Sequence, residues 1–134
     1  MDASSTFATT PSNRWLGLRL LQRSPDLARV EMPVRAEFLQ EAGVVQGGIL
    51  TALADTTAVW LLWPDLATDH TMTGSGCSMH FLGGATLDGG PLLAEAVPLR
   101  RGRTLSVCES TVHQGDRLVA KGTFTFLVRQ RRTS

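Results

Sequence analysis

The chain has 134 residues, of which 43% are hydrophobic and 19% charged, with a formal net charge of +1. This length suits one globular domain rather than two, and the composition is that of a folded protein rather than a disordered one. The near-neutral charge excludes the general basic surface that non-specific nucleic-acid binding requires, so we expect no nucleic-acid partner and only local anion sites.

The first residues, MDASSTFATTPSN, are polar and lack the basic and apolar regions of a secretory signal. The longest apolar run, Ile49 to Trp63, is shorter than the roughly 20 residues that span a membrane. We therefore expect a cytoplasmic protein with no membrane contact. The expected organisation is a flexible tail over residues 1–11, a single domain over residues 12–130 and a basic tail over residues 131–134.

The first elements predicted along the chain are a short helical turn capped by Ser12 and a hairpin. Two short alternating stretches predict strands near residues 18–24 and 27–33, joined by a Ser-Pro-Asp turn. A glycine-punctuated connection then leads to a long helix from Gly47 to about Leu62, where apolar residues recur at spacings of three and four. The helix is apolar almost all round, so most of its surface should be buried.

The rest of the chain predicts strands separated by short turns. The stretches TMTGSGCSMHFLG, PLLAEAVPLRRGR, TLSVCESTVH and RLVAKGTFTFLVRQ follow one another after the helix. Short turns imply antiparallel neighbours, because a parallel pair needs a long crossover. The sequence therefore predicts the α+β class, with an antiparallel sheet of five to six strands and one long helix on one face. One face of the last strand should hold Leu118, Ala120, Gly122, Phe124, Phe126 and Val128.

Asp55 is the one charged residue between Ile49 and Trp63. A buried ionised carboxylate costs several kcal/mol unless a partner compensates it, and this helix supplies no cation. Asp55 is therefore either a helix-edge residue bonded to Thr51 or Thr56, or a catalytic carboxylate in a cleft.

Gly47 and Gly48 stand at the start of the predicted helix. Backbone N–H groups there have no partner within the helix and suit an electron-rich carbonyl oxygen, so with a carboxylate they form a constellation for acyl transfer. Asp55 lies roughly 12 Å farther along the axis and about 80° around it. One helix cannot bring both groups to one carbonyl, whereas two antiparallel copies about a two-fold axis can. We therefore expect a homodimer with two composite sites.

The stretch GVVQGGILTALADTTA resembles the helix signature of the hotdog-fold thioesterases, above all the phenylacetate-degradation type and the 4-hydroxybenzoyl-coenzyme A thioesterases. The eight-residue spacing from Gly47 to Asp55 matches, and the resemblance extends over about residues 13–130 in strand order and glycine placement. It implies a curled antiparallel sheet wrapped around one long central helix. It also implies a dimer, often doubled to a dimer of dimers, that hydrolyses acyl-coenzyme A without metal or bound cofactor.

The resemblance implies roles for three residues in and before the helix. Asp55 would be the nucleophile or the general base, the Gly47 amide would polarise the thioester carbonyl, and Gln40 would orient water or the thioester. The phenylacetate type usually has His where this chain has Gln46, and glutamine cannot change its protonation at neutral pH. We expect Gln46, with Gly48, to bind the substrate through hydrogen bonds.

Further substrate contacts are predicted outside the helix. Arg101 and Arg103, in a glycine turn, can grip the coenzyme's phosphates, although solvated charge at a hairpin end explains them equally well. Thr73 and Ser75 are expected to line the acyl pocket near Asp55.

Two cysteines, Cys77 and Cys108, form no disulfide framework and are predicted to be small core residues. Cys77 and His80 should point to opposite faces of a strand, so no metal site is expected.

The expected function is hydrolysis of an acyl- or aryl-coenzyme A thioester at a dimer interface, with coenzyme A present only as part of the substrate. The alternative is a non-catalytic protein on the same fold that binds acyl-coenzyme A or an acyl carrier. A third reading is a dimerisation module without a ligand.

Overall fold

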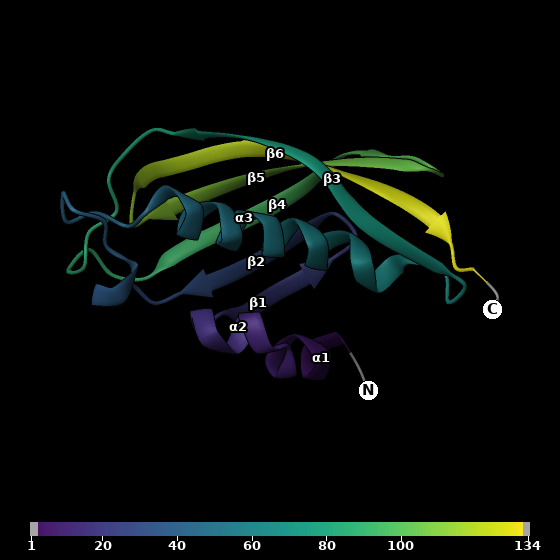
Figure 1. Cartoon of the computed structure of the whole chain (residues 1–134), viewed down its shortest axis with the longest axis horizontal. Coiled ribbons are helices and arrows are strands. Elements are labelled where there is room, and N and C mark those ends of the chain that lie inside the picture. The colour runs from purple at the N-terminus through teal and green to yellow at the C-terminus, as the bar shows by residue number, and fades with distance from the viewer. Residues whose placement is uncertain (1–2, 133–134) are drawn as a thin grey trace.

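The computed structural model describes residues 3–132 of the chain. Its helices and strands, in chain order, are α1 (Ala3–Thr9), α2 (Pro11–Leu16), β1 (Arg19–Ser24), β2 (Leu27–Met32), η1 (Ala36–Phe38), α3 (Gly47–Leu62), η2 (Trp63–Asp65), β3 (His70–Phe81), β4 (Leu92–Arg101), β5 (Leu105–Gln114) and β6 (Arg117–Gln130). The six strands of this described part form one antiparallel sheet in the order β1-β2-β4-β5-β6-β3. The sheet curls around α3, which lies along its concave face (Figure 1). The predicted α+β class is confirmed.

The N-terminal residues differ from the prediction. Residues 3–9 form helix α1 rather than a flexible tail, because Phe7 buries its ring, 2% exposed, edge-on against Trp60 of α3 at 5.2 Å between ring centroids. Helix α2 begins at Pro11 with Thr10 as its N-cap, so the prediction of a cap at Ser12 is wrong. Proline suits the first helical position because its missing N–H would have no partner there.

Helix α3 begins at Gly47 and ends at Leu62, as predicted. It packs on a face of the sheet where small side chains let the helix approach closely; those with no exposed surface are Ala28, Ala94, Ala96, Cys108 and Ala120. The buried hydroxyl of Ser110 on β5 donates a hydrogen bond of 3.0 Å to the carbonyl oxygen of Ala54. This bond fixes the turn of α3 that carries Asp55.

Strand β3 is an edge of the sheet, hydrogen-bonded to β6 on one side (Figure 1). It is 12 residues long, and residues 73–78 are all exposed. A β-bulge interrupts its pairing, because Gly74 lies opposite Phe126 and Gly76 opposite Thr125, which leaves Ser75 unpaired. A bulge reverses which residues face the core. Gly74 before it and Cys77 after it therefore face the same side as α3.

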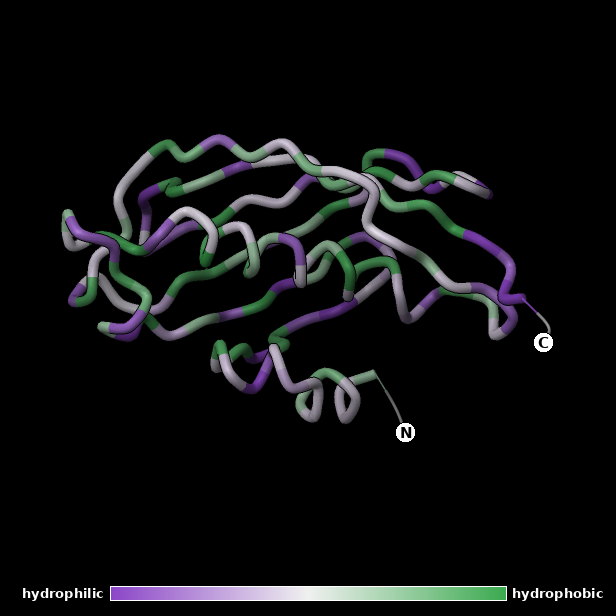
Figure 2. The backbone as a smooth tube through the Cα atoms, viewed as in Figure 1, coloured by the Kyte–Doolittle hydropathy of each residue, from purple (hydrophilic) through white to green (hydrophobic). Residues whose placement is uncertain are grey.

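A second irregularity lies at the start of β6. The pairing shifts between Val112 and His113, which lie opposite Ala120 and Leu118. Val119 is consequently fully buried and Leu118 is 36% exposed, so the predicted inward position of Leu118 is wrong. The hydrophilic end of β6 runs out to the C-terminus (Figure 2). In residues 3–132, no helix is long and apolar enough to cross a membrane.

Candidate active site

Asp55 lies in a hollow of about 380 Å³ between α3 and the edge of the sheet, here called the Asp55 hollow. Its lining residues come from α3, β3 and β6: Gly48, Thr51, Ala52, Asp55, Gly74, Gly76, Cys77, Phe124, Thr125 and Phe126. The side chain of Asp55 is exposed in the single chain. The carboxylate therefore stands at an open wall of the molecule rather than in its core.

Within residues 3–132, no cation neutralises the carboxylate of Asp55. The hydroxyl of Thr51 donates instead to the carbonyl oxygen of Gly47, at 2.9 Å, which removes one of the local partners considered from the sequence. Desolvation by the surrounding protein raises the pKa of Asp55, and no hydrogen bond or charge from the described residues opposes it. A carboxylate placed at this unfavourable position is a candidate for chemistry.

The start of α3 opens into a different cavity of about 460 Å³, here called the Gly47 hollow. Its lining residues are Gln40, Val44, Val45, Gly47, Leu50, Phe81, Leu82, Gly83 and Gly84. The chain is tied down as it enters the helix, since Val45 donates to the carbonyl of Ala85 at 2.9 Å and Gln46 to that of Phe38 at 2.8 Å. Within residues 3–132, no acceptor meets the backbone N–H groups of Gly47 and Gly48. These donors are available to a ligand.

Gln40 forms part of a tight loop that lines the Gly47 hollow. Its backbone N–H donates to the carbonyl of Val44 at 2.8 Å, and its side-chain oxygen accepts from the N–H of Ala42. The structure thus brings Gln40 and Gly47 to one cavity, as the resemblance implies.

Gln46 is the N-cap of α3. Its Oε1 accepts a hydrogen bond of 3.1 Å from the backbone N–H of Ile49, and this donor fixes which end of the amide faces the helix. A Cβ on Gly48 would lie 2.7 Å from the same oxygen, so glycine there makes room for the cap. The capping role escaped the sequence reasoning because glutamine is not a favoured N-cap residue. The Nε2 hydrogens of Gln46 remain to donate elsewhere.

Acyl transfer would need the Gly47 amide and the Asp55 carboxylate at one carbonyl group, but the two groups line different hollows. Gln40 and Gly47 line one cavity, while Asp55 and Gly48 line the other. The distance expected from helix geometry therefore holds in the folded chain, and one protomer does not bring the Gly47 amide to Asp55.

Thr73 and Ser75 do not line the Asp55 hollow, contrary to expectation. The β-bulge gives those positions to Gly74, Gly76 and Cys77. The hydroxyl of Ser75 donates to the carbonyl of Thr125 at 3.3 Å. Cys77 is an exposed thiol in this hollow rather than the predicted core residue, whereas Cys108 is buried as predicted. Among residues 3–132, no cluster of His, Cys, Asp and Glu could hold a metal ion.

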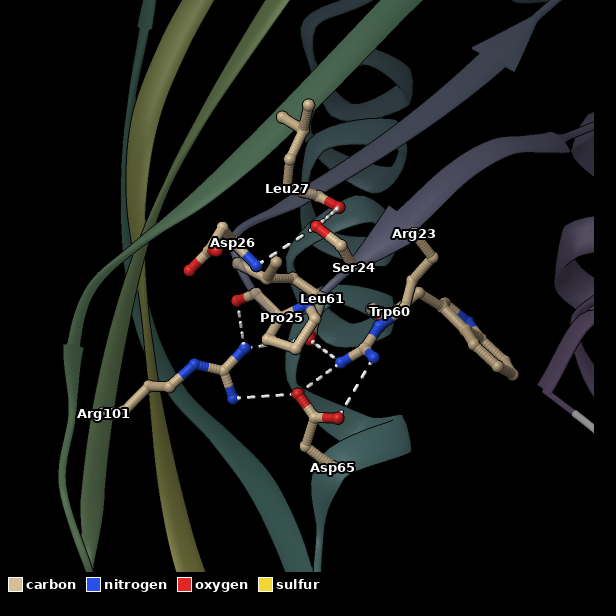
Figure 3. A network of polar contacts seen from close by, with 9 residues as sticks. All are labelled: Arg23, Ser24, Pro25, Asp26, Leu27, Trp60, Leu61, Asp65 and Arg101. Atoms are coloured by element: carbon tan, nitrogen blue, oxygen red, sulfur yellow. Dashed lines mark hydrogen bonds and ion pairs between the residues drawn. The ribbon is translucent and has the colours of Figure 1, made fainter.

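Arg101 belongs to a polar network at the far end of α3 (Figure 3). Its guanidinium pairs with Asp65 at 3.2 Å and donates to the carbonyl of Pro25 at 2.6 Å and to that of Leu61 at 3.3 Å. These contacts engage its donors, so the structure lends no support to phosphate binding by Arg101. Arg103 is exposed in the turn between β4 and β5.

Arg23 completes this network. Its guanidinium binds both carboxylate oxygens of Asp65, at 3.0 and 2.6 Å, and donates to the carbonyls of Trp60 and Leu61 in the last turn of α3. The hydrogen bond from Arg23 is the main cause that lowers the pKa of Asp65. The network fastens the hairpin of β1 and β2 to the helix end.

Arg23→Ala is expected to lower the free energy of unfolding by about 2 kcal/mol, because the carbonyl of Trp60 loses its side-chain donor and Asp65 and the carbonyl of Leu61 keep only their contacts with Arg101. A lowered pKa in the fold means that Asp65 stabilises the protein above the ordinary aspartate range and that this stabilisation is lost as the pH falls through it. Denaturant unfolding should therefore show a gap between wild type and Asp65→Asn at pH 7 that closes below about pH 4. A gap independent of pH would contradict the assignment.

One long helix wrapped by a curled antiparallel sheet, with a glycine pair at the helix start and a lone carboxylate farther along, defines a hotdog-fold protein. Residues 42–121 match the thioesterase superfamily. The chain belongs to this superfamily, and the hotdog fold implied by the sequence resemblance is confirmed.

Individual relatives agree with this assignment. A candidate esterase of Mycobacterium tuberculosis is 32% identical over 118 residues, which are 85% of this chain and 83% of the relative. The crystal structure of AziG from S. sahachiroi is 31% identical, with a TM-score of 0.85 over 92% of this chain and 98% of that chain. A single-residue mutant of the phenylacetic acid degradation protein PaaI from Thermus thermophilus is 28% identical, with a TM-score of 0.80 over 88% and 98% of the two chains. The resemblance to the phenylacetate-degradation type is therefore confirmed.

Proposed function

We propose that the protein hydrolyses acyl-coenzyme A thioesters at sites shared between two copies of the chain. The observation that carries the proposal is that, among the described residues, the N–H of Gly47 stands unpaired in one open hollow and the carboxylate of Asp55 unpaired in another, eight residues farther along one helix. Antiparallel packing of two such helices brings the Gly47 amide of one protomer to Asp55 of its partner. The thioesterase superfamily and the name of the esterase relative support this class of reaction.

In the proposed mechanism, the thioester carbonyl oxygen accepts a hydrogen bond from the backbone N–H of Gly47. Donors aimed at this oxygen stabilise the negative charge that develops on it. Asp55 then removes a proton from a water molecule that adds to the carbonyl carbon, or attacks that carbon itself to form a mixed anhydride, which water hydrolyses once the thiolate has left. The C–S bond breaks, coenzyme A leaves as its thiolate, and that thiolate takes up a proton to become the free thiol.

The other residues of the site would orient the substrate. Gln46 has its Oε1 committed to the helix cap, so Nε2 would donate to the thioester, and Gln40 would position it from the same loop. Arg103 is the proposed contact for the coenzyme's phosphates. The proposal requires no metal and no bound cofactor, because coenzyme A enters with the substrate, and it places the protein in the cytoplasm.

Strand β3 and the open side of α3 are the proposed dimer interface, since both are exposed and lie next to Asp55. Two such dimers would form the dimer of dimers. Sedimentation at low micromolar concentration is expected to show a dimer or a tetramer. A stable, folded monomer at that concentration would contradict the shared site.

The direct test is release of free thiol from a panel of short, medium and aryl acyl-coenzyme A esters. Wild-type protein is expected to hydrolyse at least one ester well above the rate of Asp55→Asn. Equal rates for the two proteins across the panel would contradict the proposal that Asp55 catalyses the hydrolysis.

The second candidate function is acyl-coenzyme A or acyl-carrier binding without hydrolysis. The observation that favours it is Gln46, which precedes Gly47 with a side chain that cannot titrate at neutral pH and that already serves as a helix cap. This function predicts binding at micromolar concentration or tighter with no turnover above background. A protein with no thermal shift in coenzyme A or its esters would instead be a dimerisation module.

A further inference from the structure

Phe81, the last residue of β3, lies against the start of α3. A Cβ built on Gly47 would lie 3.1 Å from Cζ of Phe81 and 3.3 Å from both Cε atoms, so the ring occupies the space beside the Gly47 backbone. The backbone under the ring is fixed, because Phe81 pairs with Ala120 and Leu82 donates to the carbonyl of Val119 at 2.8 Å. The ring itself is 54% exposed. A large apolar side chain is thus held at the opening of the Gly47 hollow.

Another part of the lining, the loop that follows Phe81, is closely packed. A Cβ on Gly84 would lie 2.9 Å from Cγ1 of Val44, and one on Gly83 would lie 3.2 Å from the carbonyl oxygen of Leu118. Arg117 donates to the carbonyl of Gly84 at 2.7 Å and ties this loop to β6. The loop therefore forms a firm wall, and the exposed side chains of the lining are Phe81 and Leu82, of which Phe81 lies directly beside Gly47.

The position of the ring determines what it meets when a carbonyl binds at Gly47. A carbonyl oxygen accepting from this N–H places its carbon within about 4 Å of the amide nitrogen, by standard bond lengths. The groups on that carbon therefore lie near the side chain beside Gly47. One is the sulfur of the pantetheine arm, which is common to all substrates and leads to polar amides. The other is the acyl group, which suits the apolar lining supplied by Val44, Leu50, Phe81 and Leu82.

We propose that Phe81 determines which acyl groups the site accepts, with its ring as the wall against which the acyl group lies. This inference rests on the proposed function, because it assumes that the thioester carbonyl binds at the Gly47 amide. It adds a specificity-determining residue that touches the variable part of the substrate and takes no part in the proton transfers.

The test measures kcat/KM for straight-chain esters from acetyl- to decanoyl-coenzyme A with Phe81→Ala, Phe81→Trp and the wild type. Phe81→Ala removes a whole phenyl ring and is expected to raise the ratio of long-chain to short-chain kcat/KM by about tenfold or more, since a single methylene group in an apolar pocket already has an effect of that size. Phe81→Trp should lower the ratio. Leu99→Ala is the matched control, since Leu99 is 55% exposed but lines neither hollow, and it should leave the ratio unchanged.

If Phe81→Ala changes kcat/KM by the same factor for all chain lengths, the ring contacts the pantetheine arm that all the esters share. If kcat/KM does not change for any ester, the ring contacts no part of the substrate. Either result would overturn the inference. Calorimetry in the Asp55→Asn background separates this failure from failure of the proposed function. If chain-length dependence of binding shifts with Phe81→Ala while the wild type hydrolyses nothing, the hydrolase proposal fails and the role of Phe81 stands. If the wild type hydrolyses esters but Phe81→Ala changes the chain-length dependence of neither kcat/KM nor binding, the inference alone fails. Absence of both binding and hydrolysis removes both.

Discussion

Asp55→Asn is expected to lower kcat for thioester hydrolysis by about 10³-fold or more, within the range for loss of a general base or nucleophile. Asparagine preserves the size and shape of the side chain but can neither take a proton from water nor attack the carbonyl. Because desolvation raises the pKa of the ionising group, wild-type kcat/KM should rise with pH through that raised value. Thiol release between pH 4 and pH 8 measures both effects.

Stability measurements provide the control for this variant. A raised pKa means that the folded protein holds the proton of Asp55 more tightly than the unfolded chain, so ionisation of Asp55 opposes folding. This penalty is present above the raised pKa and disappears as the pH falls through the ordinary aspartate range, near about pH 4. Asp55→Asn should therefore be at least as stable as the wild type at pH 7, with the difference closing in acid. If Asp55→Asn were inactive because it unfolds, it would instead be less stable than the wild type at pH 7.

Gly47→Pro is expected to lower kcat by about 10²- to 10³-fold, as loss of one oxyanion donor does. The substitution removes the N–H while keeping the helix, because proline is favoured at the first helical position and Gln46 already has the extended backbone that precedes proline, with φ −64° and ψ 137°. Gly47→Ala is the matched control. It crowds Phe81 with the same Cβ but retains the donor, so its loss should be much smaller. Equal losses would point to crowding instead.

Mixing the two inactive variants tests whether the site is shared. If Gly47 and Asp55 act across an interface, a mixed dimer of Asp55→Asn and Gly47→Pro contains one intact site and one doubly defective site. Random reassociation of equal amounts should restore about a quarter of wild-type activity, since about half of the dimers are mixed and each has one working site of two. Activity should be measured after joint refolding. No recovery, with mixed dimers present, would place the whole site within one chain.

The sequence alone was sufficient for most of the fold. The spacing of apolar residues, the glycine pair and Pro64 predicted both ends of α3 correctly, at Gly47 and Leu62. Short polar turns between alternating stretches predicted the antiparallel strands. Asp55 could be singled out because a charge in an apolar helix has few explanations, and helix geometry alone separated it from Gly47.

What escaped prediction depended on contacts between distant segments. Nothing in the alternation of β3 locates the bulge at Ser75, although the glycines on either side are typical of such irregularities. Arg101 resembled a phosphate contact because its partner Asp65 is 36 positions away in the sequence and meets it only in the fold. Phe7 appeared isolated in a polar segment for the same reason, since its partner Trp60 lies on α3.

The long, open edge of β3 bears on how prone the single chain is to aggregation. Residues 73–78 offer unpaired backbone groups with small side chains and no charge, which is the kind of edge that invites pairing with any other extended strand. A second copy of the chain that covers this edge would thus also reduce aggregation, because the backbone groups of β3 would no longer be open to other strands. During synthesis, single chains with this edge uncovered are the species most exposed to aggregation, so the yield of soluble protein should depend on how fast the edge is covered.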